Sequence, residues 1–167
     1  MSNAAAFSGS AASGPTLSQD GFLLPTRDGD GDGFWDAAAQ GELRIQACEA
    51  CGRLRMPPRP MCPWCRSTDK TWRLMSGRGT VWSFAIPHPP LLPAYSAVAP
   101  YNVVVVTLDE DPTIRLVGNL VATPESPLNS IDPESIQIGE RVEVAFANLI
   151  SVEGGDVAMV RWVRSGS

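Results

Sequence analysis

The sequence lacks a long apolar run and has few of the side chains that perform catalysis. Its apolar runs stop at four residues, as in 103–106, whereas a membrane-spanning helix needs at least about 18. It has one histidine, His88, in a proline-rich stretch, and all four of its cysteines fall between residues 48 and 65. Nucleophilic catalysis pairs a reactive side chain with a base, and neither a Ser-His-Asp order nor a phosphate-binding glycine loop is present. We therefore predict a chain without catalytic residues of its own.

The four cysteines form two Cys-x-x-Cys turns, Cys48–Cys51 and Cys62–Cys65. Each turn can place two thiolates on one side of a divalent ion, and two turns complete a tetrahedron. Gly52 suits a tight turn after the first pair, and Pro63 stiffens the second turn. The pattern predicts a structural Zn²⁺ site, because four thiolates leave no open position for substrate.

The cysteine pattern leaves two alternatives to a zinc site. Iron in a rubredoxin-like site uses the same four thiolates. Two disulfides are disfavoured, because the sequence shows no secretory signal and too few cysteines for a disulfide scaffold. Paired, reduced thiols without such a signal are expected in the cytoplasm.

The net charge of −5 is unevenly distributed along the chain. Residues 1–43 hold one base and six acids, residues 44–78 eight bases and two acids, and residues 79–167 four bases and ten acids. The basic segment therefore coincides with the predicted zinc ribbon. Its cations offset the negative charge of a zinc ion held by four thiolates. They also suit an anion, such as a phosphate group or an acidic partner surface, and the sequence leaves both interpretations open.

Four segments are expected along the chain: a disordered tail (1–19), an N-terminal helical segment (20–42), the zinc ribbon (43–75) and an OB-fold domain (76–165). The tail has almost no apolar anchor, and its opening residues resemble a cloning remnant. In the helical segment, Asp32 is the expected N-cap and Gly41 the expected end of a short helix. The Asp-Gly repeat at 28–33 also resembles the start of a calcium loop. Position twelve of that loop is Ala39 instead of glutamate, so the helix cap is favoured.

The sequence from Thr80 onward predicts strands. Alternating or β-branched runs lie near 81–86, 101–108, 113–121, 140–146 and 157–163. A helical turn at 132–135 falls between the third and fourth strands, which is the element order of an OB-fold barrel; a small sandwich is the alternative. The predicted fold class is therefore mainly β: a short N-terminal helix and a rubredoxin-like zinc ribbon, followed by a five-stranded OB-fold barrel.

A series of short motifs runs through this region. It comprises Phe34-Trp35, Gly41-Glu42-Leu43, the two Cys-x-x-Cys turns, Pro57-Pro58-Arg59, Trp72, Ser76-Gly77-x-Gly79 and Pro100-Tyr101. The series resembles the acyl-CoA-associated zinc-ribbon/OB-fold family called domain of unknown function thirty-five, from about residue 20 to residue 164. The Pro-Pro-Arg and Ser-Gly-x-Gly motifs are more specific than the cysteine pairs.

The resemblance implies a non-catalytic accessory subunit in a hetero-oligomer with a thiolase-superfamily enzyme: a thiolase, an acyltransferase or a retro-aldolase. The complex would form or cleave a carbon–carbon bond of an acyl-CoA in lipid or aromatic degradation, and this subunit would help to form the acyl-CoA channel. CoA phosphates favour arginine pairs, so the expected CoA-binding residues are Arg53, Arg55 and Arg59. The loop 87–100 lies where OB-folds carry ligand-facing segments. Its expected partner or substrate contacts are His88, Leu91, Leu92 and Tyr95.

A single-stranded nucleic-acid binder is the rival hypothesis, because zinc ribbons and OB-folds both perform that role. Such binding needs a basic groove and exposed aromatic rings. The barrel segment is acidic, and its aromatic residues lie mostly on patterned strands, where packing in the core is the simpler explanation. The accessory-subunit interpretation is therefore favoured.

Overall fold

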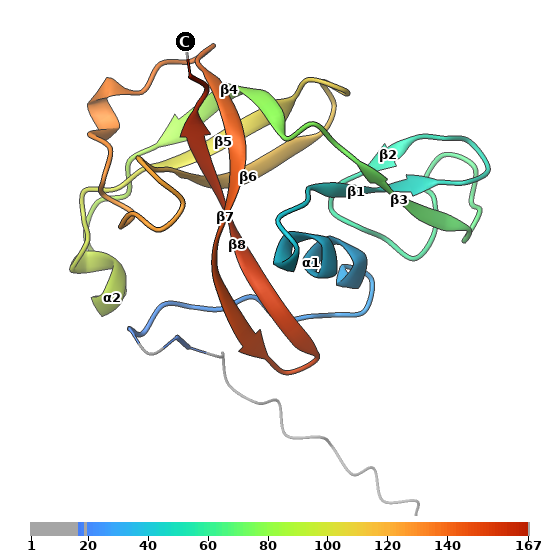
Figure 1. The fold of residues 1–167 in the computed structure, drawn as a ribbon, viewed down its shortest axis with the longest axis horizontal. Helices are drawn as coiled ribbons and strands as arrows, with labels where there is room; N and C mark the ends of the chain where they lie inside the picture. The colour runs from blue at the N-terminus through green and yellow to red at the C-terminus, as the bar shows by residue number, and fades with distance from the viewer. Residues whose placement is uncertain (1–16, 19, 167) are drawn as a thin grey trace, which may run out of the picture.

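The computed structural model describes residues 17–18 and 20–166, without the side chain of residue 148. The predicted disordered tail lies outside the described residues, except for 17 and 18. Figure 1 shows a short helix, a small three-stranded sheet and a closed five-stranded barrel. The helix is α1 (Asp32–Ala39), and the small sheet comprises β1 (Arg44–Cys48), β2 (Leu54–Arg55) and β3 (Lys70–Leu74). The barrel comprises β4 (Arg78–Ala85), β5 (Val103–Leu108), β6 (Arg115–Leu120), β7 (Arg141–Val152) and β8 (Gly155–Arg164).

The barrel has OB-fold topology, so the predicted fold class is confirmed and the sandwich is excluded. Its strand order is β4-β5-β6-β8-β7, closed by pairing of β4 with β7. All pairs are antiparallel except β6 with β8. The helical turn expected between the third and fourth strands is η1 (Pro133–Ser135), and the Asp132 carboxylate accepts a hydrogen bond from the Glu134 N–H at 3.0 Å. The loop between β4 and β5 contains the short helix α2 (Pro93–Ser96).

Ribbon, helix and barrel share one hydrophobic core. Alternation along β5 buries Val104, Val106 and Leu108, as expected for a strand with one face inward. Trp162 on β8 is fully buried in the same cluster. The cluster continues into the small sheet and the helix through Leu43, Ile45 and Phe34. The ribbon is therefore packed onto the barrel. Among the described residues, no helix is long and apolar enough to cross a membrane.

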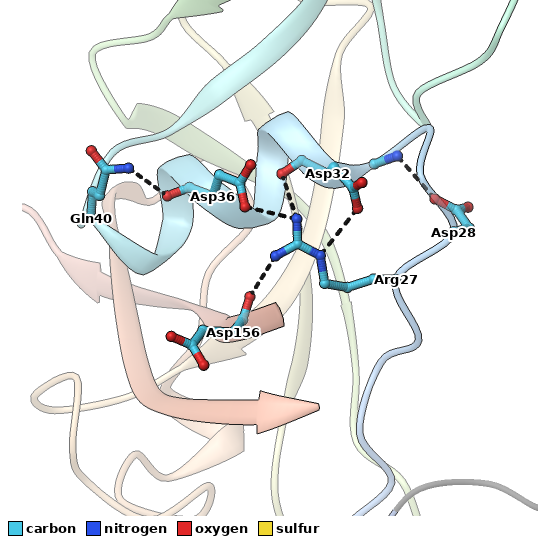
Figure 2. Close-up of polar contacts among 7 residues, drawn as sticks. Arg27, Asp28, Asp32, Asp36, Gln40 and Asp156 are labelled. Atoms are coloured by element: carbon cyan, nitrogen blue, oxygen red, sulfur yellow. Dashed lines mark hydrogen bonds and ion pairs between the residues drawn. The ribbon is translucent and has the colours of Figure 1, made fainter. Parts of the chain in front are cut away.

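Arg27 fastens the N-terminal segment to α1 and to the hairpin of β7 and β8 (Figure 2). Its side chain is 6% exposed. The guanidinium donates to the carboxylates of Asp32 at 3.1 Å and Asp36 at 2.7 Å, and to the backbone oxygen of Asp156 at 3.1 Å. Two ion pairs and two carbonyl contacts of this one cation therefore join the N-terminal segment to the helix that follows it and to a hairpin far along the chain.

The prediction of Asp32 as the N-cap of α1 is wrong by one residue. The N-cap is Gly31, and the Asp28 carboxylate accepts a hydrogen bond from the Gly31 N–H at 2.9 Å. Asp32 lies inside the first turn, where its carboxylate pairs with Arg27 instead. The end of the helix is as predicted, because Gly41 has a φ of +77° and its N–H donates to the Ala38 carbonyl.

The three carboxylates of the Asp-Gly repeat do not point toward one common metal ion. The Asp28 carboxylate faces the start of the helix, Asp30 lies 3.3 Å from Lys70 Nζ, and Asp32 faces Arg27. Each carboxylate thus has a different partner within the chain. The favoured interpretation of this run, a helix start, agrees with these contacts.

Candidate metal centre and adjoining cavities

The four cysteine sulfurs converge between the two Cys-x-x-Cys turns. The Sγ atoms of Cys48 and Cys65 lie 3.5 Å apart, those of Cys51 and Cys62 lie 3.7 Å apart, and all four lie within 4.8 Å of one another. A tetrahedral ion with Zn–S bonds of about 2.3 Å would separate its sulfurs by about 3.8 Å. The cluster is therefore a closed four-thiolate site of the size that zinc requires. Within the described residues, no other group of three or more His, Cys, Asp or Glu side chains is placed to hold an ion.

A residue with positive φ follows each cysteine pair. Gly52 has a φ of +72° and its N–H donates to the Cys48 carbonyl at 2.8 Å, as the sequence suggested. Arg66 has a φ of +63° and its N–H donates to the Cys62 carbonyl at 2.9 Å. Sequence reasoning missed Arg66, although it follows Cys65 as Gly52 follows Cys51. A non-glycine residue in this region costs roughly 1 kcal/mol or more, so the surrounding contacts must hold the turn.

The protein environment of the sulfurs favours a bound cation. The pKa of Cys48 is lowered mainly by the backbone N–H of Cys51. Burial alone would raise the pKa of Cys62. Hydrogen bonds from backbone N–H groups, of which that of Cys65 is the strongest, outweigh burial and lower the pKa to about 6. The backbone N–H of Ser67 favours the thiolate of Cys65 and is the largest single effect on its pKa. The neighbouring sulfurs, chiefly that of Cys48, together with burial outweigh it and raise the pKa of Cys65 to about 12. Four sulfurs this close cannot all ionise alone, and a divalent ion supplies the missing positive charge.

The three arginines expected to bind CoA do not share one environment. Arg53 is exposed, and its guanidinium carbon lies 5.2 Å from the centroid of the Trp64 ring. Arg55 on β2 is only 2% exposed, and none of its guanidinium nitrogens has a hydrogen-bond partner among the described residues. Arg59 is exposed. Arg55 and Arg59 line a cavity of about 350 Å³, which we call the basic cavity, bounded by residues 54–57, 59, 63–64 and 113–114.

A larger cavity of about 620 Å³ lies among α1, the segment after β2, α2 and the strands β5, β6 and β8. We call it the apolar cavity; Phe34, Trp35, Met56, Tyr101 and Val160 are among its walls. Of the four loop residues expected to face a partner or substrate, Tyr95 lines this cavity. His88, Leu91 and Leu92 lie outside its lining, and His88 and Leu92 are exposed.

One end of the apolar cavity is polar because of a buried network that sequence reasoning missed. Asn102 is fully buried and brackets Leu120, donating to its carbonyl at 2.8 Å and accepting from its N–H at 2.7 Å. Asn119, which lines the cavity, donates to the Asn102 carbonyl and accepts from Arg161 at 3.0 Å. Burial lowers the pKa of the Arg161 guanidinium. The polar residue directly after Pro100-Tyr101 was the available signal, since a strand entering a core there would otherwise be apolar.

The two cavities adjoin. Met56 and Pro57 line both of them. A region with unpaired arginine donors thus meets a mostly apolar one at these two residues. The arrangement suits a ligand that carries an anionic group and an apolar part.

A closed four-cysteine ribbon packed onto an OB-fold barrel defines a zinc-ribbon/OB-fold protein. Residues 35–71 match the ChsH2 rubredoxin-like zinc ribbon domain, and residues 72–147 match the ChsH2 C-terminal OB-fold domain. A DUF35 domain-containing scaffold protein of Methanothermobacter thermautotrophicus is 34% identical over 110 residues, covering 65% of this chain and 74% of that protein. The chain therefore belongs to the ChsH2/DUF35 family, and the ion that the four cysteines are built to hold is the zinc of its ribbon domain.

Two further relatives are named as hydratase subunits. A probable enoyl-CoA hydratase alpha subunit of Thermomonospora curvata is 43% identical over 107 residues, which is 64% of this chain and 30% of that protein. A 3-oxo-4,17-pregnadiene-20-carboxyl-CoA hydratase alpha subunit of Mycobacterium tuberculosis is 34% identical over 130 residues, which is 78% of this chain and 38% of that protein. The chain thus spans about a third of the length of these two curated relatives.

The fold also matches a solved structure described as the Ltp2-ChsH2(DUF35) aldolase. The match has a TM-score of 0.67 and 33% sequence identity, and it covers 84% of this chain and 98% of that chain. The fold is therefore shared with a chain of the structure described as the Ltp2-ChsH2(DUF35) aldolase.

Proposed function

We propose that this chain is a zinc-stabilised accessory subunit of a thiolase-superfamily enzyme and helps to form that enzyme's acyl-CoA channel. The observation that carries the proposal is the likeness, over almost the whole of the other chain, to a component of the Ltp2-ChsH2(DUF35) aldolase. The chain's four cysteines all lie in the metal cluster, so the nucleophile of a thiolase-type reaction would come from the partner. On its own the chain is proposed to be inactive.

An exposed apolar patch beside the apolar cavity supports a partner face there. Trp82 on β4 is 51% exposed, and the Arg115 guanidinium carbon lies 3.9 Å from the centroid of its ring. Val117, two residues further along β6, is 60% exposed, and both Arg115 and Val117 line the apolar cavity. Large apolar side chains gathered at a cavity mouth are typical of interaction surfaces. Trp82 is an exception to the expectation that barrel aromatics pack mostly in the core, because Trp162 lies in the core cluster and Phe84 and Phe146 pack against it.

The proposed ligand contacts follow from the cavities. Arg53, Arg55 and Arg59 are proposed to meet the phosphates of CoA on the ribbon side, and Tyr95 the acyl group in the apolar cavity. The exposed loop residues His88 and Leu92, with Leu91 beside them, are proposed to contact the partner. The names of the two hydratase relatives, both of which contain CoA, support an acyl-CoA or a related thioester as the substrate class.

Co-expression with a thiolase-like protein encoded beside this chain tests the proposal. Size-exclusion chromatography and metal analysis should show a stable complex that contains zinc, and an acyl-CoA cleavage assay should show activity only when both chains are present. Elution of the two proteins as separate species, with full activity of the neighbour alone, would contradict it.

A further inference from the structure

We propose that residues 20–28, which we call the N-terminal strap, form a closing wall of the apolar cavity, and that Arg27 is the positioning residue that holds this wall in place for an apolar ligand. The inference rests on the proposed function only for the natural ligand, the acyl part of an acyl-CoA. The wall itself rests on the contacts around Arg27.

The partners of Arg27 belong to elements that enclose the apolar cavity. The residues directly before and after Arg27 both line that cavity. The guanidinium pairs with Asp32 and Asp36 on α1, a helix that contributes two aromatic rings to the lining (Figure 2). It also donates to the carbonyl of Asp156 on β8, a strand that contributes two further lining residues. One side chain thus holds together three elements of the cavity wall.

Arg27 acts on the strap and not on the ligand. It is not among the residues that line the cavity, and its charge is paired with two carboxylates. The cavity that it shapes is mostly apolar. An uncharged apolar group therefore fits the cavity better than an anion.

The rest of the strap is only lightly attached. Among the described residues, the hydrogen bonds of residues 20–26 lead only to Ser18, which lies in the same segment. The Phe22 ring meets the Tyr95 ring edge to face, with the ring centroids 5.0 Å apart. Tyr95 lines the cavity and lies on α2, a helix with no buried residue. Arg27 is therefore the strong attachment of the strap, and the Phe22–Tyr95 contact is a weaker second one.

A wall that is in place before the ligand arrives raises affinity. If the strap is closed in only a fraction of the molecules, the apparent Kd rises in inverse proportion to that fraction. The ion pairs of Arg27 keep the closed fraction high, because a guanidinium that binds two carboxylates and a carbonyl at once fixes the backbone that carries it. Loss of Arg27 should thus weaken ligand binding without removing any contact to the ligand.

Fluorescence titration of the zinc-loaded full chain with N-phenyl-1-naphthylamine tests the wall without any partner. This uncharged dye fluoresces in apolar surroundings, and we expect saturable one-to-one binding. Arg27→Met keeps the aliphatic stem and removes every donor, so it should raise the Kd at least about tenfold. The variant should still fold, because the carboxylates that it leaves unpaired, Asp32 and Asp36, are 46% and 62% exposed. Arg141→Met is the matched control: it removes another paired arginine that does not line the cavity, and should change the Kd by less than about twofold.

A disulfide between strap and α2 supplies a readout that a merely structural Arg27 would not move. A Cβ built on Gly21 lies 3.6 Å from the Cβ of Ala94, close to the separation of about 3.8 Å found in disulfides. Neither residue lines the cavity. Gly21→Cys with Ala94→Cys, in the Arg27→Met background, should restore the Kd to within about threefold of the wild type when oxidised, and lose that recovery when reduced. Gly21 has a φ of +81°, and any strain of a cysteine there is common to both redox states of the same protein.

Phe22→Ala tests the wall from its other end with the Arg27 ion pairs intact. Loss of the aromatic contact should raise the Kd about two- to tenfold, although Phe22 does not line the cavity. Leu23→Ala is the control for this variant, because Leu23 is the next residue, is 40% exposed and also does not line the cavity. Wild-type affinity in both Arg27→Met and Phe22→Ala, no recovery in the oxidised disulfide variant, or no dye binding by the wild type would each overturn the proposal.

The partner complex separates this inference from the proposed function. In the complex, Arg27→Met should raise the KM for the acyl-CoA and leave kcat within about twofold, because it alters binding and not the reacting groups. An active complex in which Arg27→Met leaves the KM unchanged would refute the strap alone. If the dye responds to the variants as expected but no partner associates, the strap stands and the accessory role fails.

Discussion

Gly33 on α1 lies directly against the Trp72 ring on the ribbon strand β3. A Cβ atom added to Gly33 would overlap Nε1 and Cε2 of Trp72 on β3 and would lie 2.6 Å from its Cδ1. Trp72 is packed against the shared core and therefore has little room to withdraw. Gly33→Ala is thus a test of whether helix and ribbon are held together as described.

The sign of the effect distinguishes this packing from simple helix propensity. In a helix that touched nothing, replacing glycine with alanine would stabilise the protein by up to about 1 kcal/mol. Forcing an extra carbon into a packed contact costs typically about 1–3 kcal/mol. We therefore expect Gly33→Ala to lower the free energy of unfolding by about 1–2 kcal/mol. For a chain of this size, each 1 kcal/mol lowers the melting temperature by about 2–4 °C.

Urea unfolding followed by circular dichroism, with zinc in excess, measures the change. The matched control is the same substitution in a Trp72→Leu background, where the ring that blocks the Cβ is gone. There the destabilisation should disappear or change sign, because only the gain in helix propensity remains. A Gly33→Ala protein at least as stable as the wild type, with Trp72 intact, would refute the packing described here.

Three further predictions concern the metal, a surface ion pair and the histidine. Cys62→Ser should lose stoichiometric zinc and unfold the ribbon; a zinc-replete variant with an unchanged melting curve would exclude the site. Hydrogen bonding from Arg141 lowers the pKa of Asp109, so its stabilising effect is complete above the ordinary pKa of 3.8 and is lost as the pH falls through the lowered value. Asp109→Asn should accordingly lower the free energy of unfolding at pH 6, and its difference from the wild type should shrink as the pH falls below 3.8. The difference should be small at every pH, because the pair is exposed. His88→Ala should leave the activity of the complex within a few fold in a cleavage assay, whereas a loss on the order of a thousandfold would show acid–base catalysis.

The barrel was predictable because its strands follow period-2 patterns that end at turn residues. Val104, Val106 and Leu108 alternate inward as the sequence suggested. The pattern failed at the end of β7, which was expected to stop at 146 and continues to Val152. The register of β7 against β8 shifts between Ala147 and Ile150, so the alternation breaks there although the strand continues.

The metal cluster was predictable for a different reason, namely that all four ligands are local in sequence. The environments of Arg53 and Arg55, in contrast, could not be predicted from the sequence. Arg55 is buried and lines a cavity together with Thr113 and Ile114 from the barrel, which lie far along the chain. Arg53, only two residues earlier, is exposed and stacks near Trp64. The sequence suggested one common environment because the arginines are close along the chain, whereas the fold exposes Arg53 to solvent and buries Arg55.

The metal and the basic cavity are coupled through the strands of the ribbon. Cys48 ends β1, and Gln46, two residues earlier on the same strand, pairs with Arg55 on β2. The turn that joins β1 to β2 contains Cys51 and Gly52, so the ion fixes the register that sets Arg55 beside Gln46. Binding of zinc and folding of such a ribbon are one equilibrium. We therefore expect that a structural ion with no open coordination position also sets the positions of Gln46 and Arg55 beside the basic cavity.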